Sequence, residues 1–125
     1  MLARLRIIIM QNPNIHNHVS MPQKLAFRMK LIPGFEEEYE RRHREIWPEL
    51  VTLLKDTGII DYQIFLDRET STLFAFQVIE GEATSQDLGN TEIVQRWWKH
   101  MADIMETNPD NSPISVELPN VFDLP

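Results

Sequence analysis

The chain has 125 residues and an apolar fraction of 42%, which suits one domain with a buried core. Its formal net charge of −7 argues against nucleic acid or an anionic membrane surface as a partner, because both are bound by basic patches. The sequence contains no cysteine, which fits the reducing environment of the cytoplasm.

Residues 1–20 show no periodic core pattern, and we expect them to form an extension to a single domain of residues 21–125. The apolar run at residues 7–10 is shorter than a signal-peptide core of about 7–15 residues, and far shorter than a membrane span. His16 and His18 are potential metal ligands, but two histidines in a polar tail rarely form a site. We expect neither a metal nor a membrane partner.

The first half of the domain predicts a strand followed by helical segments. Apolar residues at every second position predict a strand over residues 25–31. Helical spacing then starts at Phe35. Pro48 interrupts it and predicts a kink or a new helix at that residue, because proline is tolerated at the first helical position but not in the interior. Gly58 is expected to cap this second helix.

Two further strands are predicted over residues 60–66 and 73–79, and a polar turn joins them as a hairpin. In the first of these strands, Tyr62 shares a face with Ile60 and Ile64. A polar connection with a short helical turn is expected over residues 81–90.

The last part of the chain predicts one helix and one strand. Asn90 or Thr91 is a suitable N-cap for a helix whose apolar stripe continues to Met105. Residues 115–122 predict a final strand at the edge of the sheet, because Pro119 interrupts it and proline is confined to edges.

The order strand, helix, strand, strand, helix, strand predicts an α+β fold of the ferredoxin-like, split βαβ type. Residues 73–79 are apolar on both faces of their strand. The helices of one chain can cover only one face of a sheet, so we expect a second copy of the chain to cover the other. The expected assembly is a homodimer, described as a dimeric α/β barrel.

Adjacent tryptophans within a charged segment form the most distinctive motif of the chain. Neighbouring residues on a helix point about 100° apart, so Trp97 and Trp98 cannot both occupy the centre of one face. Trp97 continues the apolar stripe, and we expect it to be the more buried of the two. Core packing explains such a pair, but an indole face also stacks on the C–H bonds of a sugar ring.

Tyr39 and His43 are four residues apart and therefore share one helix face. Ile46 and Leu50 continue this face toward the core. Histidine can both give and take protons near neutral pH, because its ordinary pKa is about 6.5. The alternative interpretation is a surface histidine within a charged segment.

These segments together resemble the L-rhamnose mutarotase family, from about Lys24 to Pro125. The segments that carry the resemblance are Tyr39 to His43, Ile46 to Leu50, Tyr62 to Asp67, Gln95 to Trp98, Asn108 to Pro113, Glu117 with Leu118, and Leu124 with Pro125.

The resemblance implies an isomerase that interconverts the α and β anomers of L-rhamnose by general acid–base chemistry. It implies that His43 is the catalytic acid and that Tyr39, Tyr62, Trp97 and Trp98 contact the sugar. It also implies a homodimer. Proton transfers suffice for this reaction, so no metal or cofactor is expected, and the general base stays unassigned.

Two alternatives remain open at this point, because ferredoxin-like dimers serve unrelated functions. One is a small monooxygenase of the same fold. The other is a non-catalytic sugar-binding module, which would bind the sugar without changing the rate of anomer exchange.

Overall fold

A computed structural model describes residues 21–125 of the chain; the extension predicted for residues 1–20 lies outside the described residues. Two helices follow the first strand, a pair of strands comes next, and a third helix precedes the last strand; two short 3₁₀ turns occur, at Ser85–Asp87 and Ala102–Ile104. The longer elements are β1 (Gln23–Lys30), α2 (Glu36–Arg44), α3 (Pro48–Asp56), β2 (Ile59–Asp67), β3 (Thr72–Ile79), α4 (Glu92–Met101) and β4 (Val116–Leu118).

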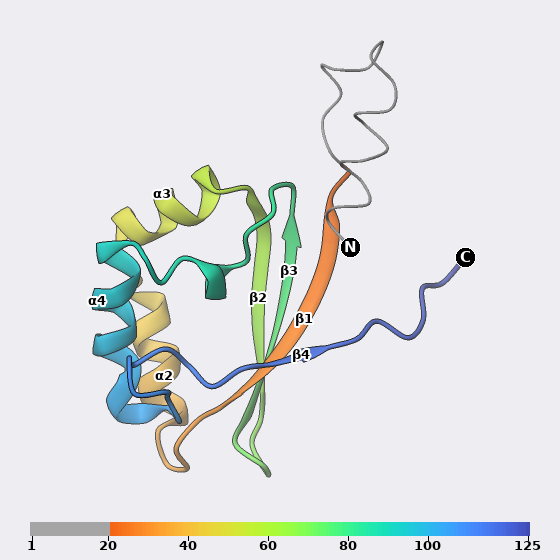
Figure 1. Ribbon diagram of the computed structural model, residues 1–125. Helices are drawn as coiled ribbons and strands as arrows, with labels where there is room; N and C mark the ends of the chain where they lie inside the picture. Colours follow the sequence, from red (N-terminus) through yellow and green to blue (C-terminus); the bar gives the residue numbers. More distant parts are fainter. Residues whose placement is uncertain (1–20) are drawn as a thin grey trace.

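The strands form one antiparallel sheet in the order β2-β3-β1-β4. This order, with helices between β1 and β2 and between β3 and β4, confirms the predicted ferredoxin-like, split βαβ architecture. Figure 1 shows α2, α3 and α4 together on one side of the sheet. The core therefore lies between these helices and the sheet face that they cover.

Pro48 begins a new helix, so of the two predicted alternatives, a kink or a new helix, the second is confirmed. The preceding Trp47 has an extended backbone, and Pro48 occupies the first turn of α3. Gly58 follows the end of α3 with φ +103° and donates its N–H to the carbonyl of Lys55 at 3.1 Å, which confirms the predicted cap. A Cβ at this position would lie only 2.7 Å from the backbone nitrogen of Gly81, so the site also requires a glycine for space.

The predicted end of α4 was wrong. The α-helix stops at Met101, and a 3₁₀ turn follows it. Met105 then has an extended backbone and forms an antiparallel bridge with Leu31, the residue after β1. Pairing with the sheet thus replaced the last predicted helical turn. Thr91 is the N-cap residue, as expected, but its hydroxyl donates to the carbonyl of Leu88 at 2.6 Å and does not cap the helix.

The last strand is shorter than the predicted range of residues 115–122. β4 contains only Val116–Leu118, paired with β1, because Pro119 cannot donate a ladder hydrogen bond. The chain then runs away from the body toward the C-terminus (Figure 1), and Val121, Phe122 and Leu124 are exposed. A second correction concerns Ile60, which a β-bulge leaves exposed instead of on the buried face of Tyr62.

Within residues 21–125, no helix covers the sheet face opposite α2, α3 and α4 (Figure 1). Phe65 on β2 and Phe76 on β3 are both exposed, and their ring centroids lie 5.7 Å apart in an edge-on contact. The alternate residues of β3, such as Leu73 and Ala75, are buried on the helical side. The predicted apolar character of both faces is therefore present. None of the described helices is long and apolar enough to cross a membrane.

Candidate active site

A cavity of about 720 Å³ lies between the helices and the covered face of the sheet. Its volume is in the range of pockets that hold small molecules. Its apolar walls come from both layers and include Met29, Leu73 and Met101. All the site residues predicted from the sequence line this one cavity: Tyr39, His43, Tyr62, Trp97 and Trp98.

Tyr39 and His43 lie side by side on α2, as their spacing predicted. Their ring centroids are 4.3 Å apart. The Nδ1 atom of His43 lies 3.1 Å from the backbone carbonyl oxygen of Tyr39. A carbonyl oxygen can only accept a hydrogen bond, so Nδ1 carries a proton. In the neutral ring Nε2 is then the unprotonated nitrogen, and it is the atom free to exchange protons with a ligand.

Burial lowers the pKa of His43 below its ordinary value, because desolvation penalises the charged imidazolium. The hydrogen bond to the Tyr39 carbonyl acts in the opposite direction and only partly offsets this effect. His43 is therefore mainly neutral at pH 7, and a proton placed on its ring is readily given up. This behaviour suits a group that exchanges protons.

Tyr62 reaches the cavity from β2. Its hydroxyl oxygen accepts a hydrogen bond from the Ser85 hydroxyl at 3.3 Å. Burial raises the pKa of Tyr62, and hydrogen bonding from Ser85 and Gln77 partly offsets the rise. Burial also raises the pKa of Tyr39, and the charge of an ionised Tyr62 would raise it further. The two phenols thus stay protonated near neutral pH and are close enough to influence each other.

The prediction that Trp97 is the more buried of the two tryptophans was wrong, since the exposed fractions of Trp97 and Trp98 are 9% and 8%. Trp97 packs edge-on against His43 and against Trp47, with ring centroids 5.4 and 5.1 Å apart. Trp98 is covered from another direction by Gly89, where a Cβ would lie 2.6 Å from its ring. Different neighbours cover the two indoles, so both are buried despite their angular offset.

Three residues around these groups were not among the predicted site residues. Trp47 extends the aromatic cluster, and it was noted only as part of a motif. Ser85 donates a hydrogen bond to the Tyr62 hydroxyl, and Gln77 in turn donates one to Ser85. Gln77 had a usable signal, because it is a polar residue at a buried position of an otherwise apolar strand. Ser85 had no signal, since nothing in a polar connection indicates which hydroxyl will be buried.

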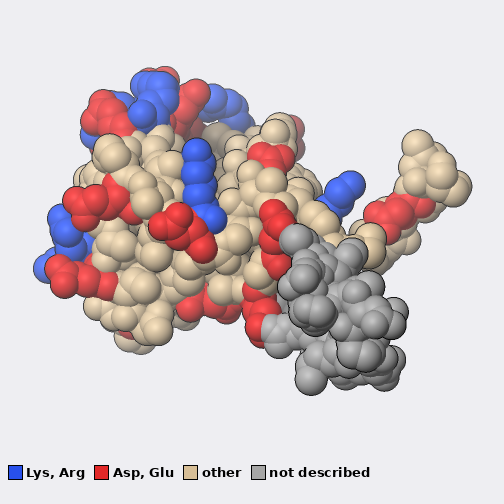
Figure 2. Space-filling view, turned by 90° about the horizontal axis from the view of Figure 1, so that it is seen from above, with Lys and Arg blue, Asp and Glu red and all other residues tan. Residues whose placement is uncertain are grey.

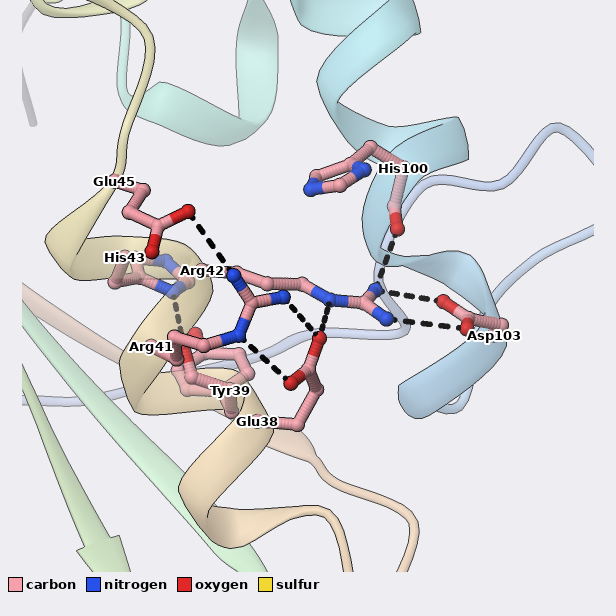
Figure 3. A network of polar contacts seen from close by, with 8 residues as sticks. All are labelled: Glu38, Tyr39, Arg41, Arg42, His43, Glu45, His100 and Asp103. Atoms are coloured by element: carbon pink, nitrogen blue, oxygen red, sulfur yellow. Dashed lines mark hydrogen bonds and ion pairs between the residues drawn. The ribbon is translucent and has the colours of Figure 1, made fainter.

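Arg42 connects the two helices that carry most of the site (Figure 3). On α2, its Nε donates to Glu38 at 2.7 Å. Toward α4, it donates to the backbone carbonyl of His100 at 2.7 Å and to both carboxylate oxygens of Asp103. Arg41 also pairs with Glu38 from the outer side of α2. These contacts hold α2 and the end of α4 in a defined relative position.

The charged surface shows a mixed pattern. Figure 2 shows acidic side chains spread across one face, with the basic side chains in separate groups beside them. Across residues 21–125, no group of three or more His, Cys, Asp and Glu side chains is arranged to hold a metal ion. His16 and His18 lie outside the described residues.

The fold and the cavity define a ferredoxin-like α+β protein with a cavity lined by aromatic side chains on the helical face of its sheet. A family model described as L-rhamnose mutarotase matches residues 24–124. The chain belongs to the L-rhamnose mutarotase family.

Two bacterial relatives support this assignment. The L-rhamnose mutarotase of Bacteroides thetaiotaomicron is 66% identical over 97 residues, which cover 78% of this chain and 93% of that protein. The L-rhamnose mutarotase of Formosa agariphila is 57% identical over 100 residues, which cover 80% of this chain and 96% of that protein.

Solved structures agree with the fold. The crystal structure of the L-rhamnose mutarotase from Formosa agariphila superposes with a TM-score of 0.76 at 53% identity, covering 82% of this chain and 99% of that one. A protein described as a putative antibiotic biosynthesis monooxygenase from Bacteroides thetaiotaomicron superposes with a TM-score of 0.53 at 13% identity, covering 83% and 91% of the two chains. The second likeness concerns the fold alone.

Proposed function

We propose that this protein interconverts the α and β anomers of L-rhamnose. The observation that carries the proposal is the convergence of a proton-exchanging His43 and several aromatic side chains on one cavity. Membership of the L-rhamnose mutarotase family supports the choice of sugar.

Anomer exchange requires the sugar ring to open and to close again on the other face of the aldehyde. During opening, a base takes the proton of the anomeric hydroxyl, the C–O bond to the ring oxygen breaks, and an acid protonates the ring oxygen. The anomeric carbon becomes an aldehyde. After rotation about the adjacent C–C bond, the same transfers run in reverse. Ring opening and ring closure are both assisted by proton transfers and involve no change of oxidation state, so the reaction requires no metal or cofactor, and activity should survive treatment with EDTA.

His43 is the acid in this scheme in its protonated form, in which Nε2 also carries a proton and gives it to the ring oxygen; the neutral form takes the proton back at the same atom. The Tyr39 carbonyl orients the ring through Nδ1, which leaves Nε2 for the sugar. Positioned acids and bases of this kind each contribute about 10²–10⁴-fold to a rate. Trp97 and Trp98 offer indole surfaces to the apolar face of the sugar. Tyr39 and Tyr62 offer hydroxyl groups to its oxygens, and the residue that serves as base stays unassigned.

Two other functions are compatible with the fold or with the cavity. A monooxygenase would consume oxygen, and its only support is the shared fold at 13% identity. A non-catalytic sugar-binding module would bind L-rhamnose and leave the exchange rate unchanged. A partly buried imidazole whose Nε2 is left for a ligand favours catalysis, because simple binding does not require a titratable group at that place.

Saturation-transfer NMR on the anomeric protons of L-rhamnose tests the proposal directly. The wild-type protein should accelerate the exchange, and His43→Ala should lose about 10²–10⁴-fold of that acceleration. The control is the melting temperature of the variant together with its binding of L-rhamnose by calorimetry, both of which should persist. An exchange rate in His43→Ala near that of the wild type would reject the role of His43. No acceleration by the wild type would reject the function.

We further infer that two copies pair through the uncovered sheet face, giving the homodimeric α/β barrel. Phe65 and Phe76 form an apolar patch on this face, and such patches usually mark an interface. Phe76→Glu should shift the sedimentation of the protein from dimer to monomer at micromolar concentration. Phe35→Glu is a matched control, because Phe35 is 38% exposed against 44% for Phe76 and lies at the start of α2. A wild-type monomer would overturn the inference.

We also expect a cytoplasmic location, since a chain without cysteine gains no disulfide from an oxidising compartment. Cell fractionation with an antibody against the protein checks this expectation, and recovery in the periplasmic fraction would contradict it.

A further inference from the structure

A chain of hydrogen bonds with a fixed direction leads from the backbone to Tyr62. It begins at Ser85, whose backbone N–H donates to the Oε1 atom of Gln77 at 3.3 Å. A backbone N–H can only donate, so the atom that faces it must be the amide oxygen. This contact fixes the orientation of the Gln77 side chain, which is almost completely buried on β3.

With its oxygen held in this way, Gln77 presents its Nε2 group to the hydroxyl oxygen of Ser85. This donor–acceptor distance is 2.6 Å. The Gln86 side chain donates to the same oxygen at 3.2 Å. A serine hydroxyl has two acceptor sites and one proton, so both acceptor sites are filled and the proton remains to be donated.

The proton of Ser85 is directed at the hydroxyl oxygen of Tyr62, 3.3 Å away. Tyr62 therefore receives a hydrogen bond from Ser85 and does not give one to it. Its own proton is left for the cavity that it lines. The backbone N–H fixes the direction of the two Gln77 contacts, and the Gln86 amide nitrogen, which fills the second acceptor site of Ser85, completes the direction toward Tyr62.

We propose that Ser85, oriented by Gln77, is a positioning residue that holds the Tyr62 hydroxyl as a hydrogen-bond donor toward an oxygen atom of the sugar. This inference rests on the proposed mutarotase function and adds residues to its site. Ser85 acts only through Tyr62. It favours one of the two hydrogen-bonding directions of the phenol, so that the donor is already arranged before the sugar enters.

A double-mutant cycle separates this role from a structural one. Ser85→Ala in the wild-type background should lower kcat/KM for anomer exchange about three- to tenfold, the size expected for one hydrogen bond. In the Tyr62→Phe background, the same Ser85→Ala change should alter kcat/KM by less than twofold, because no phenol remains to be oriented. Equal losses in both backgrounds would overturn the proposal, as would unchanged activity in the single Ser85→Ala variant.

Two further variants serve as controls. Ser85→Thr keeps the hydroxyl and should retain most of the activity. Ser85→Cys keeps the volume of the side chain and should lose activity to the same extent as expected for Ser85→Ala. The cysteine variant therefore tests the proposal even if the alanine variant is too unstable to assay. Thr84→Ala removes the cap of the same 3₁₀ turn, where the Thr84 hydroxyl accepts from the Gln86 N–H at 3.1 Å. It should lower the melting temperature and leave kcat/KM near the wild-type value. A loss in Thr84→Ala equal to that in Ser85→Ala would mean that any loosening of the turn suffices, and would overturn the proposal.

NMR of the tyrosine rings gives a readout that does not depend on activity. The chain has two tyrosines, so the ¹³Cζ signals of Tyr39 and Tyr62 can be assigned with one Tyr62→Phe variant. Ser85→Ala should move the Tyr62 signal at neutral pH and leave the Tyr39 signal in place, because only the Tyr62 oxygen loses a hydrogen bond. An unmoved Tyr62 signal would overturn the proposal even if the protein is an active mutarotase. A moved signal in a protein without exchange activity would instead reject the proposed function.

Discussion

Arg42 and Asp103 form a bidentate ion pair between α2 and the 3₁₀ turn that follows α4. The two Nη atoms of Arg42 lie 2.8 and 3.2 Å from the two carboxylate oxygens of Asp103. The Arg42 side chain is only 12% exposed, so water competes weakly for it. Its partner on the other side, Glu38, has its pKa lowered to about 2 by hydrogen bonds from Arg41 and Arg42. The pair sets the spacing between the helix that carries His43 and the helix that carries the tryptophans.

We expect Arg42→Ala to lower the free energy of unfolding by about 1–3 kcal/mol, the range for lost hydrogen bonds to charged groups. The sugar KM should rise as well, because α2 and α4 are no longer held together. Urea denaturation and the NMR exchange assay measure the two effects. Arg44→Ala is the control, since Arg44 lies 3.7 Å from Glu40 with both side chains exposed, and it should change stability by less than about 0.5 kcal/mol. Equal losses in the two variants would contradict this prediction.

Stability should fall at mildly acidic pH because of His43. Folding lowers the pKa of this residue, so the unfolded chain binds its proton more readily than the folded chain does. The contribution of His43 to stability is therefore present in full above its unfolded pKa of about 6.5. This contribution is lost as the pH falls from there to the lower folded pKa, and it does not change further below the folded pKa. Urea denaturation at several pH values checks this trend. His43→Gln should remove this part of the dependence, and an identical dependence in the variant would rule out His43 as its source.

Gly89→Ala should destabilise the protein by about 1–3 kcal/mol. The added Cβ would lie 2.6 Å from the buried ring of Trp98, and a packed indole has little room to move. A smaller ring should relieve the conflict, so Gly89→Ala should cost less in a Trp98→Phe background than in the wild type. Thermal denaturation of the two single variants and the double variant measures this coupling. Strictly additive losses of stability in the double variant would mean that the Trp98 ring does not clash with a side chain at position 89.

A chain that begins at Met21 should fold and catalyse anomer exchange like the full chain. The family match starts at residue 24, and β1 starts at Gln23. The melting temperature and the exchange rate should both stay within experimental error of the full-length values. Aggregation or lost activity of the shortened chain would contradict the prediction. It would suggest that the apolar run at residues 7–10 adds to an edge of the sheet.

Local spacing accounts for the parts of the structure that the sequence predicted well. The i, i+4 positions of Tyr39 and His43 place both side chains on one helix face, and their ring centroids lie 4.3 Å apart. Pro48 starts a helix and Gly58 ends one because their backbone preferences act within a few residues. The order of these local elements was enough to predict the ferredoxin-like topology.

Features that depend on distant segments were decided only by the tertiary structure. The burial of Trp98 depends on the Gly89 loop, and the shortened α4 depends on the bridge from Met105 to Leu31. Ser85 and Tyr62 are 23 residues apart, and Arg42 and Asp103 are 61 residues apart. Periodicity describes which face of an element is apolar, but it carries no information about which other segment covers that face. The residues of the cavity were therefore predictable from sequence motifs, while the hydrogen bonds that orient them follow from the packing of the folded chain.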